Sequence, residues 1–105
     1  MPTLLDEELV AEALTALTDW SGDGSAIRRT VSLPPAQLEA LLREVAAAAD
    51  SMNHHPKIER SGNAATFLLW THSEGGVTEL DMHLAARVDE LVRDAGGESS
   101  RLDPA

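Results

Sequence analysis

The amino-acid sequence predicts an α+β fold in which helices cover one face of an antiparallel sheet. Apolar residues recur at steps of three and four in three separate segments, the pattern of helices that bury one face. Between the second and third segments, two short stretches flank a Gly-Asn dipeptide that suits a tight hairpin. Helices packed on one side of such a sheet bury both kinds of apolar surface in a single core.

The first half of the chain predicts two helices separated by a strand. Residues 6–17 carry the first apolar stripe, and a turn composition follows in residues 20–24. Residues 26–33 have the β-branched, alternating content of a strand. Pro34 and Pro35 block further strand pairing and suit the opening of a second helix, which we expect to end near Met52.

The second half predicts a hairpin followed by a third helix. Two strands are expected between residues 57 and 71, around Ser61-Gly62-Asn63-Ala64, and the helix follows Gly75-Gly76. We expect Gly96-Gly97 to terminate that helix. The length favours one domain over residues 1–105, with a core over about residues 6–95 and a flexible tail over residues 98–105.

Composition narrows the possible partners and compartments. The chain has 8 basic and 18 acidic residues and a formal net charge of −10, which disfavours nucleic acid and anionic membrane surfaces as partners. It has no cysteine, so disulfides, thiolate catalysis and cysteine-ligated metals are excluded. No apolar run approaches the roughly 20 residues that span a bilayer, and no signal-peptide pattern opens the chain. We therefore expect a cytoplasmic protein.

Histidines are concentrated at the two ends of the predicted hairpin. Asn53-His54-His55-Pro56 precedes it, and Thr71-His72 follows it. A turn centred on Gly62-Asn63 places His54 opposite Thr71 and His72 opposite Asn53, where cross-strand neighbours lie roughly 5 Å apart. The hairpin is thus expected to bring three imidazoles together. Imidazole donates and accepts protons near neutral pH, so the cluster indicates acid–base catalysis.

Two other interpretations of these histidines remain open at this point. They could be surface or hydrogen-bonded structural residues, as isolated histidines usually are. They could also form a three-histidine zinc site. Adjacent strand residues point to opposite faces, however, so His54 and His55 reach one ion only if the strand is irregular.

An acid at the start of the third helix has two possible roles. Thr78 and Asp81 have the spacing of a capping box, which alone would explain Asp81. Gly75-Gly76 could also swing this helix start toward the histidines, where a carboxylate would orient an imidazole or bind a substrate amide. His83, within the same helix, is expected to face solvent or pack against another helix.

Taken together, these residues resemble the pterin-4a-carbinolamine dehydratase family. The resemblance rests on Asn53-His54-His55-Pro56, Thr71-His72, Gly75-Gly76-Val77-Thr78, Asp81 and Leu84-Ala85, and it extends over about residues 14–91. It implies three helices on one face of a four-stranded antiparallel sheet, with an additional strand near residues 18–21. It also implies a homodimer or homotetramer, because such sheets pair edge to edge.

The resemblance further implies a reaction and a set of roles. Family members dehydrate 4a-hydroxytetrahydrobiopterin to quinonoid dihydrobiopterin, in recycling the cofactor of aromatic amino-acid hydroxylases, and need no metal or redox cofactor. By position, the catalytic histidines fall on His54 and His72. His55, Pro56, Thr71 and Asp81 correspond to substrate-binding positions.

The chain departs from the family pattern at the rim of the expected site. Lys57 and Ile58 stand where an acid and an aromatic residue are usual, and Gly62 replaces an aromatic residue. These departures leave a second hypothesis open, that of a non-catalytic relative that binds a pterin or a protein partner. Measured turnover separates the two.

Overall fold

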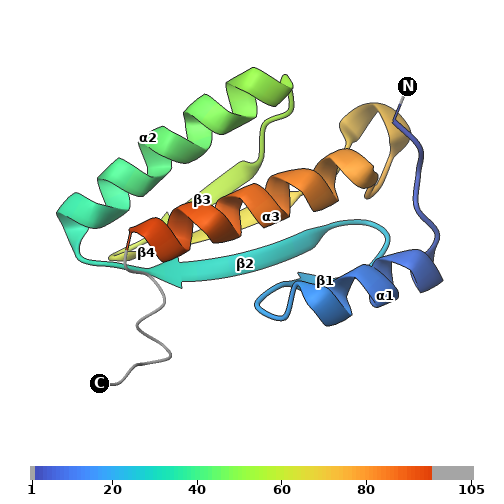
Figure 1. Ribbon diagram of the computed structural model, residues 1–105, viewed down its shortest axis with the longest axis horizontal. Coiled ribbons are helices and arrows are strands. Elements are labelled where there is room, and N and C mark those ends of the chain that lie inside the picture. The colour runs from blue at the N-terminus through green and yellow to red at the C-terminus, as the bar shows by residue number, and fades with distance from the viewer. Residues whose placement is uncertain (1, 96–105) are drawn as a thin grey trace.

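The computed structural model describes residues 2–95 and folds them into one four-stranded antiparallel sheet and three α-helices (Figure 1). Sheet order is β1-β2-β4-β3, so β1 and β3 form the edges. The elements in chain order are α1 (Glu7–Ala16), β1 (Ser21–Gly22), β2 (Ile27–Ser32), α2 (Pro35–Met52), β3 (Lys57–Ser61), β4 (Ala64–Leu69), the 3-10 helix η1 (His72–Glu74) and α3 (Glu79–Asp94).

All three helices lie on one face of the sheet, with α3 between α1 and α2 (Figure 1). Side chains of β2 and β4 alternate between the two faces of the sheet. Every second side chain enters the core, and its neighbours are less buried. The apolar side chains that form this core come from the two central strands and from all three helices: Val10, Trp20, Ile27, Val31, Leu33, Leu38, Leu41, Val45, Ala65, Phe67, Leu69, Val77, Leu84, Ala85, Val88, Leu91 and Val92. The predicted fold class is confirmed.

The hairpin has the predicted register. Ser61 pairs with Ala64 and Lys57 with Leu68, which leaves Gly62-Asn63 as a two-residue turn. Gly62 has a φ of 59°, a left-handed value that favours glycine. The resulting edge strand β3 is exposed along its whole length.

Local sequence signals set the helix starts. Asp6 caps α1 by accepting a hydrogen bond from the backbone N–H of Leu9, and Pro35 is the first residue of α2. At α3 the capping box of Thr78 and Asp81 is present, as predicted. α2 ends at Met52, and Asn53 caps it in the left-handed conformation with a φ of 53°.

The structure adjusts several predicted boundaries. The strand that the resemblance implied near residues 18–21 is β1, at Ser21–Gly22. The first helix and the first central strand are each shorter by one residue at both ends than predicted. The expected termination at Gly96-Gly97 and the expected flexible tail lie outside the described residues.

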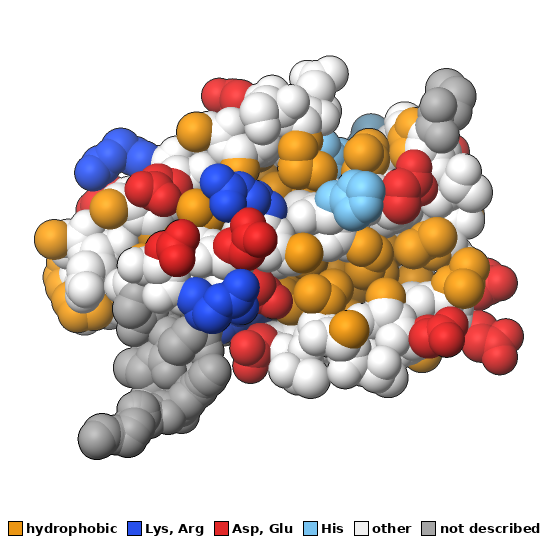
Figure 2. All heavy atoms as spheres, viewed as in Figure 1, with side chains coloured by type: hydrophobic (Ala, Val, Ile, Leu, Met, Phe, Trp, Pro, Cys, Tyr) orange, Lys and Arg blue, Asp and Glu red, His pale blue; other side chains and the backbone are white. Residues whose placement is uncertain are grey.

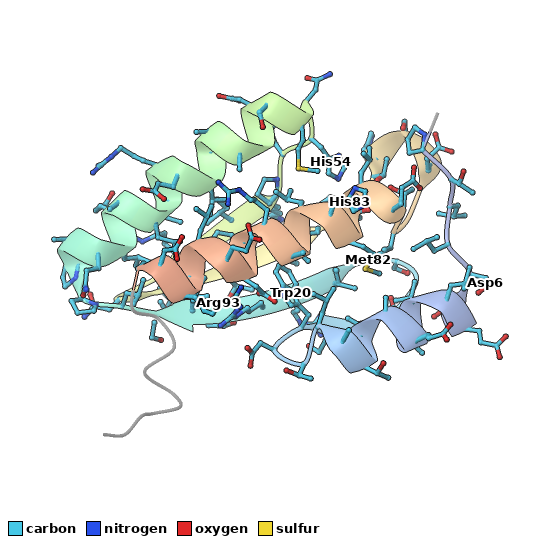
Figure 3. All side chains as sticks on the ribbon, viewed as in Figure 1. Asp6, Trp20, His54, Met82, His83 and Arg93 are labelled. Atoms are coloured by element: carbon cyan, nitrogen blue, oxygen red, sulfur yellow. The ribbon has the colours of Figure 1, made fainter. Side chains whose placement is uncertain are left out.

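Within the described residues, no helix has the length and apolar character needed to cross a bilayer. Hydrophobic side chains do reach the surface along the seam between α1 and α3, where Met82 points (Figures 2 and 3). Leu4 and Leu9, at 51% and 48% exposure, are the most exposed large apolar residues described.

A buried ion pair ties α3 to the sheet. Arg29 projects from β2 among the core residues with 7% of its surface exposed, and its guanidinium lies 2.6 Å from Asp89 Oδ1 on α3. The same carboxylate oxygen accepts the indole N–H of Trp20 at 2.8 Å. Asp19 lies 3.5 Å from the other side of the guanidinium. One carboxylate therefore connects a strand, a helix and the segment before β1.

Removal of this carboxylate should destabilise the fold far more than removal of an exposed one. We expect Asp89→Asn to lower the free energy of unfolding by about 3 kcal/mol, because the buried Arg29 charge loses its closest partner. Glu39→Gln is the matched control, since its contact with Arg60 is exposed and should be worth less than about 1 kcal/mol. Urea denaturation of both variants measures the difference, and equal losses would contradict a structural role for Asp89.

Candidate functional site

The site is built around the carboxylate of Asp81, which is fully buried. Its Oδ2 accepts the backbone N–H of Thr78 at 2.8 Å and the hydroxyl of Thr71 at 2.9 Å. Its Oδ1 lies 2.6 Å from Nε2 of His54. A carboxylate without solvent is stable only when donors satisfy both oxygens, and each oxygen here has a partner.

Two threonine hydroxyls continue this network. Thr71 Oγ1 and Thr78 Oγ1 are 2.6 Å apart, and Thr78 Oγ1 also accepts the backbone N–H of Leu80 at 3.2 Å. Both threonines are buried. Thr78 therefore serves the helix start and the site together.

His54 reaches Asp81 from the C-terminal end of α2. The left-handed turn at Asn53 reverses the chain, and the backbone N–H of His54 then donates to Ala49 O at 3.0 Å. Figure 3 shows His54 below the end of α2 and beside the first turns of α3. Its side chain is 10% exposed, so the ring is enclosed on most sides but open at one.

Backbone hydrogen bonds join the two sides of the loop between β4 and α3. Thr71 N–H donates to Gly76 O at 2.8 Å, and Gly75 N–H donates back to Thr71 O at 3.0 Å. Gly75 supplies the left-handed turn with a φ of 75°. This closure holds Thr71 and η1 in place relative to the start of α3.

Two other segments brace the same loop. Val77 N–H donates to Gly24 O at 2.9 Å, and a Cβ on Gly76 would lie only 2.6 Å from that carbonyl oxygen. On the other side, Leu5 N–H donates to Val77 O at 2.9 Å. The start of α3 is therefore held between the N-terminal segment and the turn before β2.

The N-terminal segment also affects an acid beside the site. The backbone N–H of Thr3 donates to Glu79 Oε1 at 3.0 Å. This bond, together with the backbone N–H of Glu79 itself, holds the pKa of that carboxyl below its ordinary value. The hydrogen bond from Thr3 to Glu79 is strongest while Glu79 is ionised. It weakens as the pH falls and the carboxyl of Glu79 becomes protonated.

The remaining predicted site residues are placed as follows. His55 is exposed, and its Nε2 lies 2.6 Å from Oδ1 of the exposed Asp50. Pro56, half-buried, leads into β3. His72 is exposed and opens η1 directly after Thr71. His83 is exposed on α3, as expected.

The sequence predicts that His54 and Thr71 face each other across the hairpin, whereas in the structure they are connected through Asp81. The hairpin ladder ends at Lys57 and Leu68, so neither residue is part of a strand. They share the two oxygens of Asp81 instead. The predicted pairing of His72 with Asn53 does not form as a strand pair, because Asn53 caps α2 and His72 lies in η1.

The geometry gives no support to a three-histidine metal centre. Across residues 2–95, no group of three or more His, Cys, Asp or Glu side chains could hold a metal ion. His54 and His55 instead engage different carboxylates, those of Asp81 and Asp50.

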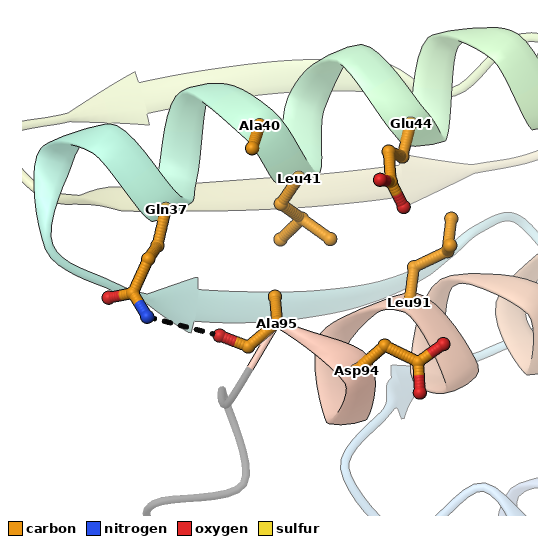
Figure 4. Close-up of a pocket in the computed structure, with 7 residues that line it drawn as sticks. All are labelled: Gln37, Ala40, Leu41, Glu44, Leu91, Asp94 and Ala95. Atoms are coloured by element: carbon orange, nitrogen blue, oxygen red, sulfur yellow. Dashed lines mark hydrogen bonds between the residues drawn. The ribbon is translucent and has the colours of Figure 1, made fainter.

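Two surface hollows lie away from this site, in the groove between α2 and α3. One has a volume of about 260 Å³, and the hydrogen bond from Gln37 to Ala95 O closes its end (Figure 4). The other, of about 340 Å³, lies against the C-terminal half of α2 and is lined in part by Ala47, Ser51 and Arg87. Neither is lined by His54, His72 or Asp81.

Two residues that make these contacts were not predicted as site residues from the sequence. Thr78 was recognised only as a helix cap, although a hydroxyl next to a loop that returns toward Thr71 was a signal for a second role. Asp50, the partner of His55, lies near the end of α2 and was assigned no role; a carboxylate five residues before His55, across the end of the helix, was the available signal.

The arrangement has the elements of acid–base catalysis. A buried carboxylate orients one enclosed imidazole, and a second imidazole follows the threonine that bonds to the same carboxylate. A carboxylate that fixes the orientation of a histidine is a recurring device for controlling which ring nitrogen is free to react.

Comparisons with known proteins identify one family. The family model described as pterin 4 alpha carbinolamine dehydratase matches residues 3–91. A Nocardia farcinica protein with the provisional name pterin-4-alpha-carbinolamine dehydratase is 46% identical over 86% of this chain and 96% of its own length. A protein of the same provisional name from Mycobacterium sp. (strain KMS) is 40% identical over 88% of this chain and 98% of its own.

Solved structures give the same result. A transcriptional coactivator/pterin dehydratase from Brucella melitensis superposes with a TM-score of 0.81 at 32% identity, over 85% of this chain and 98% of its own. A pterin dehydratase-like protein identified as a RuBisCO assembly factor in the alpha-carboxysome has a TM-score of 0.56 at 26% identity, over 69% of this chain and 84% of its own. The fold and the matched sequence agree, and this chain belongs to the pterin-4a-carbinolamine dehydratase family.

Proposed function

We propose that this protein dehydrates a 4a-hydroxytetrahydropterin to the quinonoid dihydropterin, by acid–base catalysis with His54 and His72. The reaction would serve the recycling of a tetrahydropterin cofactor. The observation that carries the proposal is the contact of the buried Asp81 carboxylate with His54, in a chain of this family.

The reaction needs two proton transfers and no redox step. The bond between ring carbon 4a and its hydroxyl oxygen breaks, and an acid gives that oxygen a proton so that water leaves. A base removes the proton of a neighbouring ring N–H, whose electrons form the new double bond. Two imidazoles, one protonated and one neutral, supply both transfers near neutral pH.

The placement of the two histidines is consistent with these roles. His54 is held by Asp81, and His72 follows Thr71, whose hydroxyl donates to the same carboxylate. His72 is exposed and His54 is partly open, so a ligand can reach both rings from outside. We assign His55, Pro56, Thr71 and Asp81 to substrate binding and positioning around them.

A second candidate function is that of a family member that acts by binding. The likeness to the structure identified as a RuBisCO assembly factor favours it, as do the departures from the family pattern at Lys57, Ile58 and Gly62, although Gly62 lies in the hairpin turn at the far end of β3 from His54. Retention of both histidines and of Asp81 favours catalysis. Turnover of chemically prepared 4a-hydroxytetrahydropterin decides between the two, because a binding protein would leave the spontaneous dehydration rate unchanged.

Removal of either proposed catalytic histidine should abolish most of the activity. We expect His54→Ala and His72→Ala each to lower kcat by about 10²–10⁴-fold, the usual effect of a lost general acid or base. His83→Ala is the matched control, since this exposed histidine on α3 should be dispensable. Steady-state kinetics and thermal melts test this, and full activity in both site variants would refute the assignment.

Turnover should persist without metal. The two imidazoles account for both proton transfers, so we expect exhaustive dialysis against a strong chelator to leave kcat within about twofold of its starting value. Elemental analysis of the same sample verifies that metal has been removed. Loss of activity that zinc restores would show that the acid–base account is wrong.

Self-association through the sheet is also expected. The edge strand β3 pairs with β4 on one side only and its five residues are exposed, and exposed strand edges tend to pair. We expect light scattering at micromolar concentration to give the mass of a dimer or tetramer. An Ile58→Pro or Arg60→Pro variant, at positions that alternate with the hydrogen-bonded pair Ser61–Ala64 and whose N–H therefore points away from β4, should shift the mass toward the monomer, while a monomeric wild type would contradict the expectation.

A further inference from the structure

The hydrogen bonds around Asp81 permit only one arrangement of protons. A carboxylate oxygen only accepts, so Thr71 must donate its hydroxyl proton to Asp81 Oδ2. Having given its single proton there, Thr71 Oγ1 must be the acceptor in its bond with Thr78. Thr78 therefore donates to Thr71 and accepts from the N–H of Leu80. Thr71 Oγ1 thus donates once and accepts once, whereas Thr78 Oγ1 donates once and accepts from the backbone of the first turn of α3.

With this arrangement of protons, His54 is the residue that must donate a hydrogen bond to Oδ1 of Asp81. The two donors from Thr71 and Thr78 occupy Oδ2, and Oδ1 lies 2.6 Å from His54 Nε2. Because Asp81 is fully buried, Oδ1 requires a donor, so Nε2 must carry a hydrogen. That holds whether the imidazole is neutral or protonated. The ring nitrogen that gains and loses a proton is therefore Nδ1.

We propose that the hydroxyls of Thr71 and Thr78 are positioning groups, which hold Asp81 as the acceptor for His54 Nε2–H and leave Nδ1 to exchange a proton with the pterin. The assignment of the tautomer stands on the geometry alone. Only the exchange with a pterin rests on the proposed function.

Substitutions of the two threonines should distinguish a role in positioning Asp81 from a merely structural role. Thr78 also caps α3, so its replacement affects stability as well as the network. Thr71 has no capping role, and in Thr71→Val the carboxylate keeps the backbone N–H of Thr78 while losing the hydroxyl. Thr71→Val therefore isolates the positioning effect, and Thr71→Ser should restore the hydroxyl.

The chain contains a matched control for this substitution. Thr30 and Thr66 form another pair of hydroxyls, 2.7 Å apart across β2 and β4, on the sheet face opposite the helices. Thr66→Val removes a hydroxyl from a threonine pair without contact to Asp81. We expect it to leave both the His54 tautomer and kcat unchanged.

The tautomer can be measured without any substrate. Long-range ¹H–¹⁵N correlation spectra distinguish a protonated from an unprotonated ring nitrogen, and a His54→Ala spectrum assigns the signals. At a pH where the ring is neutral, we expect hydrogen on Nε2 in the wild type and in Thr66→Val. Asp81→Asn should reverse this, because its single acceptor oxygen remains with Thr71 and Thr78 while its NH₂ faces Nε2, which forces the hydrogen to Nδ1.

Kinetics then test the positioning role. We expect Thr71→Val to mix the two tautomers and to lower kcat by roughly 10-fold or more with little change in KM, as with other lost partners of a catalytic group. Thr71→Ser should recover most of the loss. Thermal melts show whether each variant is folded at the assay temperature.

The possible outcomes are distinct. A wild-type His54 with hydrogen on Nδ1 overturns the proposal, and so does a Thr71→Val variant that matches Thr66→Val in spectrum and in kcat. If wild type shows the expected tautomer but no turnover of a 4a-hydroxytetrahydropterin, the proposed function fails while the hydrogen-bond assignment stands.

Discussion

The buried carboxylate of Asp81 is the constraint on which the rest of the site depends. A charge removed from water costs several kcal/mol unless donors replace the lost hydration. Here the donors come from the end of β4, the first turn of α3 and the chain after α2. The start of a helix is also the end at which its dipole favours a negative charge. These three segments must therefore meet at one point for the fold to be stable.

That meeting point links stability and chemistry in a single residue. Thr78 caps α3 through its bond with Leu80 and orders the Thr71 hydroxyl through its own proton. The apolar side of α3, with Leu84, Ala85 and Val88 fully buried, fixes how far the helix can move. The position of Asp81 is consequently set by core packing as much as by its polar partners.

Local patterns in the sequence were sufficient for most of the fold and for part of the site. The Gly62-Asn63 turn set the hairpin register because a two-residue loop leaves little choice, and the capping box placed the start of α3. What failed was the extension of strand pairing beyond the ladder. The left-handed turn at Asn53 redirects His54 toward α3, and such a turn at a non-glycine residue has no clear sequence signal. The contacts of Asp81 and of Asp89 join residues far apart in the chain, so only the assembled core reveals them.

The brace formed by the N-terminal segment bears on how the chain folds as it is synthesised. Residues 3–5 are made well before their partners Val77 and Glu79, which are added only after β4 is complete. His54, Thr71 and Thr78 also leave the ribosome before Asp81 does. The nascent chain therefore already contains every donor to this carboxylate when Asp81 is added. Synthesis from the N-terminus never leaves Asp81 without these donors in the chain. Residues 3–5 can therefore reach their native hydrogen-bond partners only after the chain has been made through Glu79.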